Sequence, residues 1–108
     1  SVKQIETDAI QGLDFYPEVE ETCTSTSFSH IFQGGYSSGY YSYKWAEVLD
    51  ADAFEAFLEK GIFDKETATS FKKNILSAGG SEHPSILYKR FRGRDAKPDA
   101  LLKRAGLV

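Results

Sequence analysis

The feature that most constrains the fold is a series of helix signals, each bounded by glycine or proline. In every well-marked segment, apolar residues recur at helical spacing. Asp64 is placed to be the N-cap of one helix, Pro84 can take the first position of another, and Gly93 can end it. No segment alternates convincingly between apolar and polar residues. The sequence therefore predicts an all-α fold of several helices joined by Gly/Pro-rich loops.

These signals give a series of expected segments in chain order. We expect helices over residues 2–13, from Tyr36 to Leu58 with Gly61 as the stop, from Asp64 to the Gly79-Gly80 pair, from Pro84 to Gly93, and from Pro98 to Gly106. Asp50 and Asp52 interrupt the longest pattern, so it is either one kinked helix or two abutting helices, with Asp52 and Glu55 as a capping box. Residues 14–22 are predicted to be an extended, solvated connection, and residues 23–28 a loop or short strand.

Length and charge limit the possible classes of protein. A chain of 108 residues that is 41% hydrophobic fits one domain or a piece of a larger one, and the missing methionine at position 1 is compatible with a piece. The net charge of −3 argues against a nucleic-acid partner, and no apolar run approaches the roughly 20 residues that span a bilayer. The basic residues of 89–94 are interpreted as a solvated helix face. The single Cys23 excludes an internal disulfide.

The familiar signatures of an autonomous catalytic centre do not occur. The sequence has no His-Glu-x-x-His and no Cys-x-x-Cys, and His30 and His83 are far apart, so we predict no metal site within it. Gly34-Gly35 with Gly39 does not form a phosphate-binding pattern. Nothing orients His30 as a base for Cys23, which argues against a nucleophilic pair.

The most distinctive stretch joins the glycine pair Gly34-Gly35 to a run of tyrosines. If a helix begins near Gly35, then Tyr36, Tyr40 and Tyr43 share one helical face and align three hydroxyl groups. Tyr41 and Trp45 fall on a different face and are predicted core residues. Two interpretations of the hydroxyls stay open here: a surface that grips carbonyl-rich ligands, or packing residues at the water boundary.

Longer runs of this sequence resemble a known family. They are Phe28-Ser-His30-Ile-Phe-Gln-Gly34-Gly35-Tyr36, Gly39-Tyr40-Tyr41-Ser-Tyr43-Lys-Trp45-Ala-Glu47-Val, Gly79-Gly80-Ser81 and Tyr88-Lys-Arg90-Phe91-Arg92-Gly93-Arg94. Together they resemble the C-terminal region of the thimet oligopeptidase family of zinc metallopeptidases, which contains oligopeptidases and peptidyl-dipeptidases. The resemblance covers nearly all of the chain after Phe28 and, more loosely, the part before it. It implies a helical fold around a channel that admits short peptides.

The resemblance also implies roles for individual residues. Tyr43 matches the family tyrosine that hydrogen-bonds the scissile carbonyl as it becomes an oxyanion. Tyr36, Tyr40 and His30 match residues that hold the substrate, and Gly34-Gly35 match a mobile loop that closes over it. Residues 1–108 then form the C-terminal part of the substrate cleft, whereas the zinc motif lies upstream of this region. We expect zinc in the full-length parent, none bound by these residues, and a cytoplasmic protein.

A rival interpretation remains open. The chain can also be a stand-alone helical module that holds a peptide on its tyrosine face without catalysing a reaction. Under the peptidase interpretation, residues 1–108 alone hydrolyse nothing, because the zinc motif is missing. Their partners are short peptides and the rest of the same chain, with self-association possible through exposed apolar area. Release of C-terminal dipeptides and internal cleavage are both compatible with the resemblance.

Overall fold

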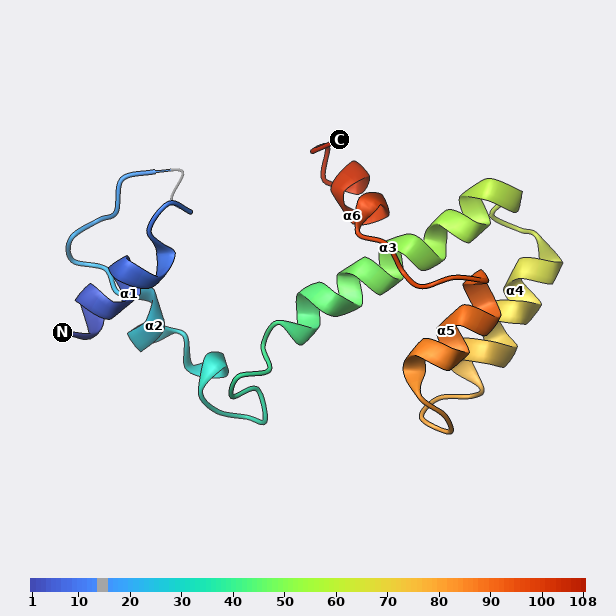
Figure 1. Cartoon of the computed structure of the whole chain (residues 1–108), viewed down its shortest axis with the longest axis horizontal. Coiled ribbons are helices and arrows are strands. Elements are labelled where there is room, and N and C mark those ends of the chain that lie inside the picture. Colours follow the sequence, from blue (N-terminus) through green and yellow to red (C-terminus); the bar gives the residue numbers. More distant parts are fainter. Residues whose placement is uncertain (14–15) are drawn as a thin grey trace. The chain divides into compact units, whose positions relative to one another are not determined.

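The chain divides into two compact units, unit 1 (Ser1–Ser42) and unit 2 (Tyr43–Val108). A computed structural model describes residues 1–13 and 16–108 (Figure 1). No residue in these two ranges lies in a strand, so the predicted all-α class is confirmed for them. Within the same ranges, no helix combines the length and apolar character needed to cross a membrane.

Unit 1 is built from short helical pieces. They are α1 (Val2–Ile10), α2 (Thr24–Ser27) and the 3-10 turn η1 (Ser29–Ile31). The Ser1 side chain caps α1 by accepting the backbone N–H of Gln4 at 3.2 Å. The predicted helix over 2–13 ends early, shortly before Gly12, which has a positive φ of 83°. Residues 16–22 contain no helix, as predicted, whereas residues 14–15 of that connection lie outside the described residues.

Helix α2 corrects the expectation of a loop or short strand over residues 23–28. A carboxylate supplied by α1, that of Glu6, accepts the first two backbone N–H groups of α2. The hydroxyl of Thr26 donates to the carbonyl of Cys23 at 2.9 Å, and that of Ser27 donates to the carbonyl of Thr24 at 3.1 Å. The prediction failed because the capping group lies far away in the sequence, where local spacing does not reveal it.

Helix α3 (Ser42–Lys60) begins later than the tyrosine spacing suggested. Tyr36 and Tyr40 lie in the turns that precede it, so the prediction that they share a helical face with Tyr43 is wrong. Ser38 adopts a positive φ of 54°, which a continuing right-handed helix does not allow. The backbone N–H of Gly39 donates to the carbonyl of Tyr36 at 2.8 Å, and this bond closes a tight turn before the helix.

Helix α3 also runs without the predicted interruption at Asp50 and Asp52. Asp52 is not part of a capping box; its side chain lies in the interior of unit 2 and is only 2% exposed. There its carboxylate accepts two hydrogen bonds from Arg94, at 3.1 and 2.8 Å, and one from the hydroxyl of Tyr88, at 2.6 Å. A buried aspartate is tolerated in mid-helix because these partners replace water.

The remaining elements of unit 2 follow α3. They are α4 (Lys65–Phe71), which continues into the π-helical turn η2 (Lys72–Leu76), then α5 (Pro84–Arg92) and α6 (Asp99–Arg104). Helix α5 packs against η2, the continuation of α4 (Figure 1). The predicted boundaries are confirmed where local chemistry sets them: Asp64 caps α4 by accepting the backbone N–H of Thr67 at 2.7 Å, and Gly93 ends α5 with a φ of 74°.

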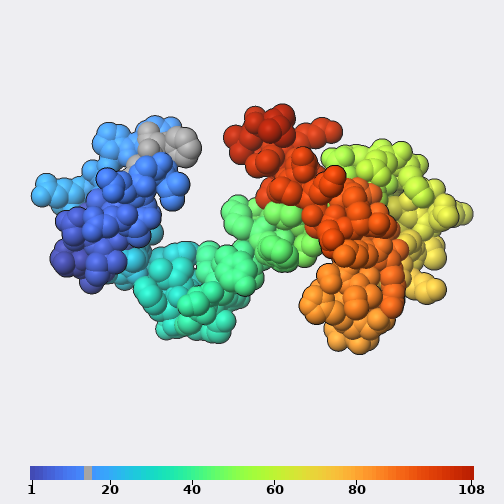
Figure 2. All heavy atoms as spheres, viewed as in Figure 1, coloured from blue at the N-terminus to red at the C-terminus, as the bar shows by residue number. Residues whose placement is uncertain are grey.

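The core of unit 2 combines small side chains with a group of aromatic rings. Its buried apolar residues are Ala51, Ala53, Ala56, Leu87, Tyr88 and Ala100. Beside them, the ring of Phe57 lies 5.9 Å from that of Phe71 and 6.4 Å from that of Phe91, and the last two are 5.2 Å apart. These contacts join α3, α4 and α5 into one packed body, visible as touching green, yellow and orange atoms in Figure 2.

Two predictions about the surface need correction. Tyr41 and Trp45, expected in the core, are 70% and 66% exposed. Among the basic residues of 89–94, expected to form a solvated face, the side chain of Arg92 is only 6% exposed. From α5 it reaches α3, where it donates two hydrogen bonds to the carboxylate of Glu59, both at 3.1 Å. Arg94 turns inward to Asp52.

Candidate functional site

Three of the predicted substrate-binding side chains meet in unit 1. The ring of His30 lies 5.7 Å from that of Tyr36 and 6.3 Å from that of Tyr40, and the two tyrosine rings are 6.1 Å apart. Phe28 completes the group, with its ring 4.7 Å from that of Tyr40 in an edge-to-face contact. We call these four residues the aromatic cluster. The cluster forms although its members do not share a helix.

The loop that carries the cluster is held by its backbone. Gly34 has a φ of 69° and Gly35 a φ of 80°, in the left-handed region that favours glycine. A Cβ at position 34 would lie 3.6 Å from the ring of Tyr36, an ordinary van der Waals contact, so the positive φ and not the space favours glycine here. The hydroxyl of Ser37 donates to the carbonyl of Phe32 at 2.6 Å and closes the loop. Gly34 and Gly35 thus provide the backbone angles that the turn requires, and they add no side chain beside the cluster.

Tyr43 belongs to unit 2, in the first turn of α3. Its side chain is 49% exposed, so the residue is open to solvent rather than part of the core. Glu47, one turn further on, pairs with Lys44 at 2.8 Å. A tyrosine at the start of a long helix has a rigid backbone beneath it, because the helix fixes its φ and ψ angles.

The tyrosines of this site offer phenol groups, whose O–H donates a hydrogen bond and whose oxygen can accept one. The imidazole of His30, which is exposed, adds a ring nitrogen to the same surface as Tyr36 and Tyr40. Such a set suits the carbonyl groups of an extended peptide.

The described residues do not offer the donor set of a metal centre. Residues 1–13 and 16–108 contain no group of three or more histidine, cysteine, aspartate or glutamate side chains placed to hold an ion. A cavity of about 340 Å³ in unit 2 is lined by charged residues of both signs and by none of the predicted site residues. Neither feature adds a reactive group to the aromatic cluster.

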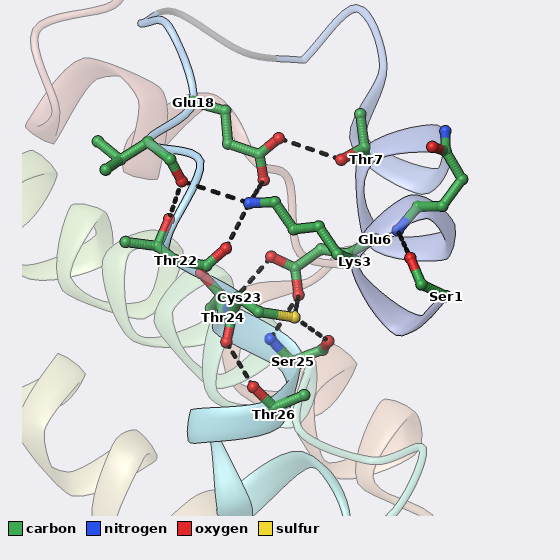
Figure 3. A network of polar contacts seen from close by, with 12 residues as sticks. Ser1, Lys3, Glu6, Thr7, Glu18, Thr22, Cys23, Thr24, Ser25 and Thr26 are labelled. Carbon is green, nitrogen blue, oxygen red and sulfur yellow. Dashed lines mark hydrogen bonds and ion pairs between the residues drawn. The ribbon is translucent and has the colours of Figure 1, made fainter.

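A polar network beside the aromatic cluster was missed at the sequence level. Glu6 of α1 accepts hydrogen bonds from the backbone of α2 and from the thiol of Cys23 (Figure 3). Lys3 of the same helix pairs with Glu18 and donates to the carbonyl of Thr22. No local signal marks these residues, since each partner lies at least 15 residues from the other.

Comparisons with known proteins agree with the family resemblance of the sequence. An oligopeptidase A of Escherichia coli is 62% identical over 81 residues, which cover 75% of this chain and 12% of that protein. A probable cytosolic oligopeptidase A of Arabidopsis thaliana is 50% identical over 96 residues, covering 85% of this chain and 14% of that protein. A dipeptidyl carboxypeptidase of Escherichia coli is 38% identical over 91 residues, covering 84% of this chain and 13% of that protein.

The chain therefore spans 12–14% of the length of these three relatives. The sequence model of peptidase family M3 matches residues 4–107, which is almost the whole chain. That match includes both units, the aromatic cluster and Tyr43. This chain belongs to peptidase family M3.

Proposed function

We propose that the chain is the C-terminal part of an M3 oligopeptidase and supplies one wall of its peptide-binding cleft. Membership in the family and the small share of the relatives' length support the idea of a part. The observation that carries the proposal is the convergence of His30, Tyr36 and Tyr40 in unit 1. These are the residues that the family resemblance assigns to substrate holding, and in the fold they form one surface.

In this proposal the aromatic cluster holds the peptide and Tyr43 acts on the reacting carbonyl. Attack on a peptide bond places negative charge on the carbonyl oxygen, and the phenol O–H of Tyr43 donates a hydrogen bond to it. A phenol donates through its own O–H, so this role needs no separate base. Gly34 and Gly35 allow the loop to close over the substrate by changing their φ and ψ angles.

We further propose that the parent protein is zinc-dependent, and that its zinc ligands lie outside residues 1–108. The donor set of the described residues does not fit a metal ion, so residues elsewhere in the parent would have to bind it. Zinc supplies a Lewis acid when bound, and this part of the chain contributes hydrogen bonds only. The 108 residues alone should therefore hydrolyse no peptide.

The substrate class and the location follow from the relatives. We propose short peptides as substrates, because the relatives include an oligopeptidase A at 62% identity and a dipeptidyl carboxypeptidase at 38%. We propose a cytoplasmic location. One Arabidopsis relative is named cytosolic and another chloroplastic/mitochondrial, so their names support a cytoplasmic location only in part.

The rest of the parent is the proposed partner of this segment. Unit 2 exposes large apolar side chains, including Trp45, which is 66% exposed, and Phe63, which is 96% exposed. Exposed apolar side chains of this size often mark a surface that packs against another part of a protein. We propose that upstream parts of the same chain pack on them. Cut from its parent, the segment should self-associate through the same area. No nucleic acid or membrane is part of this proposal.

The test is Tyr43→Phe in the full-length enzyme, with an internally quenched short peptide as substrate. We expect kcat to fall by about 10²–10³-fold, the usual loss for one oxyanion donor, with KM changed much less. The fold should survive, because the substitution removes only a hydroxyl from a half-exposed ring.

Tyr41→Phe is the matched control, since it removes the same atom two residues away from a side chain that is 70% exposed. Its kcat should equal that of the wild type. An unchanged kcat in Tyr43→Phe would contradict the oxyanion role. If the full-length protein bound the peptide without cutting it, the protein would be a binding module instead.

A further inference from the structure

We infer that Glu6 is a positioning residue for peptide binding, because its carboxylate sets the orientation of the segment that carries His30. The inference rests on the proposed function, since it takes the aromatic cluster as the surface that holds the substrate. Glu6 itself lies on α1, and the cluster begins 22 residues later at Phe28. A series of hydrogen bonds and ring contacts within unit 1 connects Glu6 to the cluster.

The first step joins α1 to α2. The two carboxylate oxygens of Glu6 accept the backbone N–H groups of Thr24 at 2.8 Å and of Ser25 at 2.6 Å (Figure 3). The thiol of Cys23 donates to the same carboxylate at 3.4 Å. These hydrogen bonds lower the pKa of Glu6 to about 2, with the contacts to Ser25 as the largest cause. The carboxylate therefore remains ionised at neutral pH and keeps accepting from both N–H groups.

The second step joins α2 to the cluster. Helix α2 has four residues, and the backbone N–H of Phe28 closes it by donating to the carbonyl of Thr24 at 2.9 Å. The N–H of Ile31 then donates to the carbonyl of Phe28 at 3.3 Å, and this turn contains His30. The ring of Phe28 packs on that of Tyr40. A rotation of α2 would therefore move Phe28 and His30 together.

Unit 1 offers little else to hold this segment in place. None of its described residues is buried, so no apolar core resists a movement of α2. Lys3 anchors the stretch just before α2 through Glu18 and the carbonyl of Thr22. Glu6 is the only described side chain of α1 with hydrogen bonds to the backbone of α2. Its loss should loosen the cluster and leave α3, which carries Tyr43, unchanged.

The test is Glu6→Gln in the full-length enzyme. Because the N–H groups of Thr24 and Ser25 meet different oxygens of Glu6, an amide in the same position keeps an acceptor for one of them and places its own NH2 donor against the other. We expect KM to rise by about three- to tenfold, which corresponds to the net loss of one ordinary hydrogen bond, while kcat stays constant. Glu6→Asp, which keeps the charge on a shorter side chain, should fall between Gln and wild type.

Two further variants separate positioning from a general loss of stability. Glu20→Gln makes the same change on an exposed side chain with no hydrogen bond or ion pair among the described residues, and its KM should equal that of wild type. His30→Ala should raise KM, and adding Glu6→Gln to it should raise KM no further, because both act on one contact. A merely destabilised enzyme would instead lose active molecules, which lowers kcat without changing KM.

The outcomes distinguish this inference from the proposed function. If His30→Ala raises KM but Glu6→Gln does not, the positioning role is wrong and the cleft proposal stands. The same conclusion follows if the rise in KM of the double variant equals the product of the rises in the two single variants. If His30→Ala leaves KM unchanged, the cluster does not hold the substrate and both fail. If Glu6→Gln does not fold, Glu6→Asp decides: a KM equal to that of wild type overturns the inference, and a raised KM with constant kcat supports it.

Discussion

Unit 1 and unit 2 are held together in different ways. In unit 1 no described residue is buried, and the contacts are exposed or partly buried hydrogen bonds and edge-to-face ring contacts. Unit 2 has a core of small apolar residues and three phenylalanine rings, with Asp52 enclosed within it. The burial of the ion pairs differs in the same way. The Lys3–Glu18 pair of unit 1 lies at the surface, whereas the side chains of Asp52 and Arg92 in unit 2 are almost fully buried. Unit 1 therefore depends on polar contacts that water can reach, whereas unit 2 depends on the packing of buried side chains.

The difference fits the tasks that we propose for the two units. A cluster that holds varied short peptides benefits from a loop that can adjust, and such loops are drawn from the least stable parts of a protein. An oxyanion donor must instead be fixed before the charge appears. His30, Tyr36 and Tyr40 lie in unit 1, which has no buried core, and Tyr43 lies on the long helix α3 of unit 2, which has one.

The largest effect is expected from Asp52→Asn in unit 2. The change removes the charge that faces Arg94 and Arg92 in the interior, where breaking one partner of a buried ion group costs about 3–5 kcal/mol. Burial raises the pKa of Asp52, but the hydrogen bonds from Arg94 and Tyr88 outweigh it and hold the pKa below its usual range. The carboxylate is therefore charged at neutral pH, and its contribution is lost only as pH falls below about 4.

The measurement is the protection of the backbone amides of α3 and α5 from hydrogen exchange in the full-length protein. The Asp52→Asn variant is compared with Asp50→Asn as the control. Asp50 pairs with Arg104 at 2.8 Å on the surface, and its loss should cost at most about 1 kcal/mol. Equal protection in the two variants would mean that the Asp52 cluster is not a structural centre of unit 2, and the contrast between the units would disappear.

An intermediate effect is expected at alkaline pH through Tyr88. Burial and the hydrogen bond to Asp52 raise the pKa of Tyr88 far above its ordinary value of about 10. Above pH 10 the unfolded chain releases this proton and the folded chain retains it, so the stability of unit 2 should fall as pH rises. Denaturant unfolding between pH 8 and about 11 follows this loss.

Tyr88→Phe isolates that contribution. It should cost about 1–2 kcal/mol at pH 7, because a buried carboxylate loses one donor. It should also flatten the fall above pH 10, since the titrating group is gone. A variant that loses stability with pH as steeply as the wild type would show that other groups cause the alkaline effect.

The smallest effect is expected from Lys3→Met in unit 1. The pair with Glu18 is exposed, and water and salt can replace it. We expect no resolvable shift in the melting temperature and only a slight rise in hydrogen exchange within α1. A large shift in melting temperature would mean that unit 1 unfolds cooperatively with the rest of the protein, and the contrast between the two units would be wrong.

Local chemistry explains which parts of the fold could be predicted from the sequence. Asp64 and Gly93 set their helix boundaries through groups within four residues, so spacing was sufficient. Asp52 was misread because its main partner, Arg94, lies 42 residues away. The helix over α2 was missed for the same reason, since its capping group comes from Glu6.

The candidate site was predicted through resemblance rather than geometry. The expected row of hydroxyls on one helix is wrong, because Ser38 turns the chain and α3 begins only at Ser42. His30, Tyr36 and Tyr40 nevertheless meet, since the loop at Gly34 brings their rings together. Helical spacing predicts which side chains share a face only when the residues lie in one helix, so it could not predict a site whose residues lie in turns.

The most direct measurement is a crystal structure of the full-length protein with an uncleavable phosphinic peptide, in which a phosphinyl oxygen stands where the oxyanion forms. The account predicts that the hydroxyl of Tyr43 lies about 2.5–3.0 Å from that oxygen, with His30 or Tyr36 against the peptide. A peptide bound with Tyr43 turned away from it and the aromatic cluster untouched would contradict the assignment of this segment to the cleft.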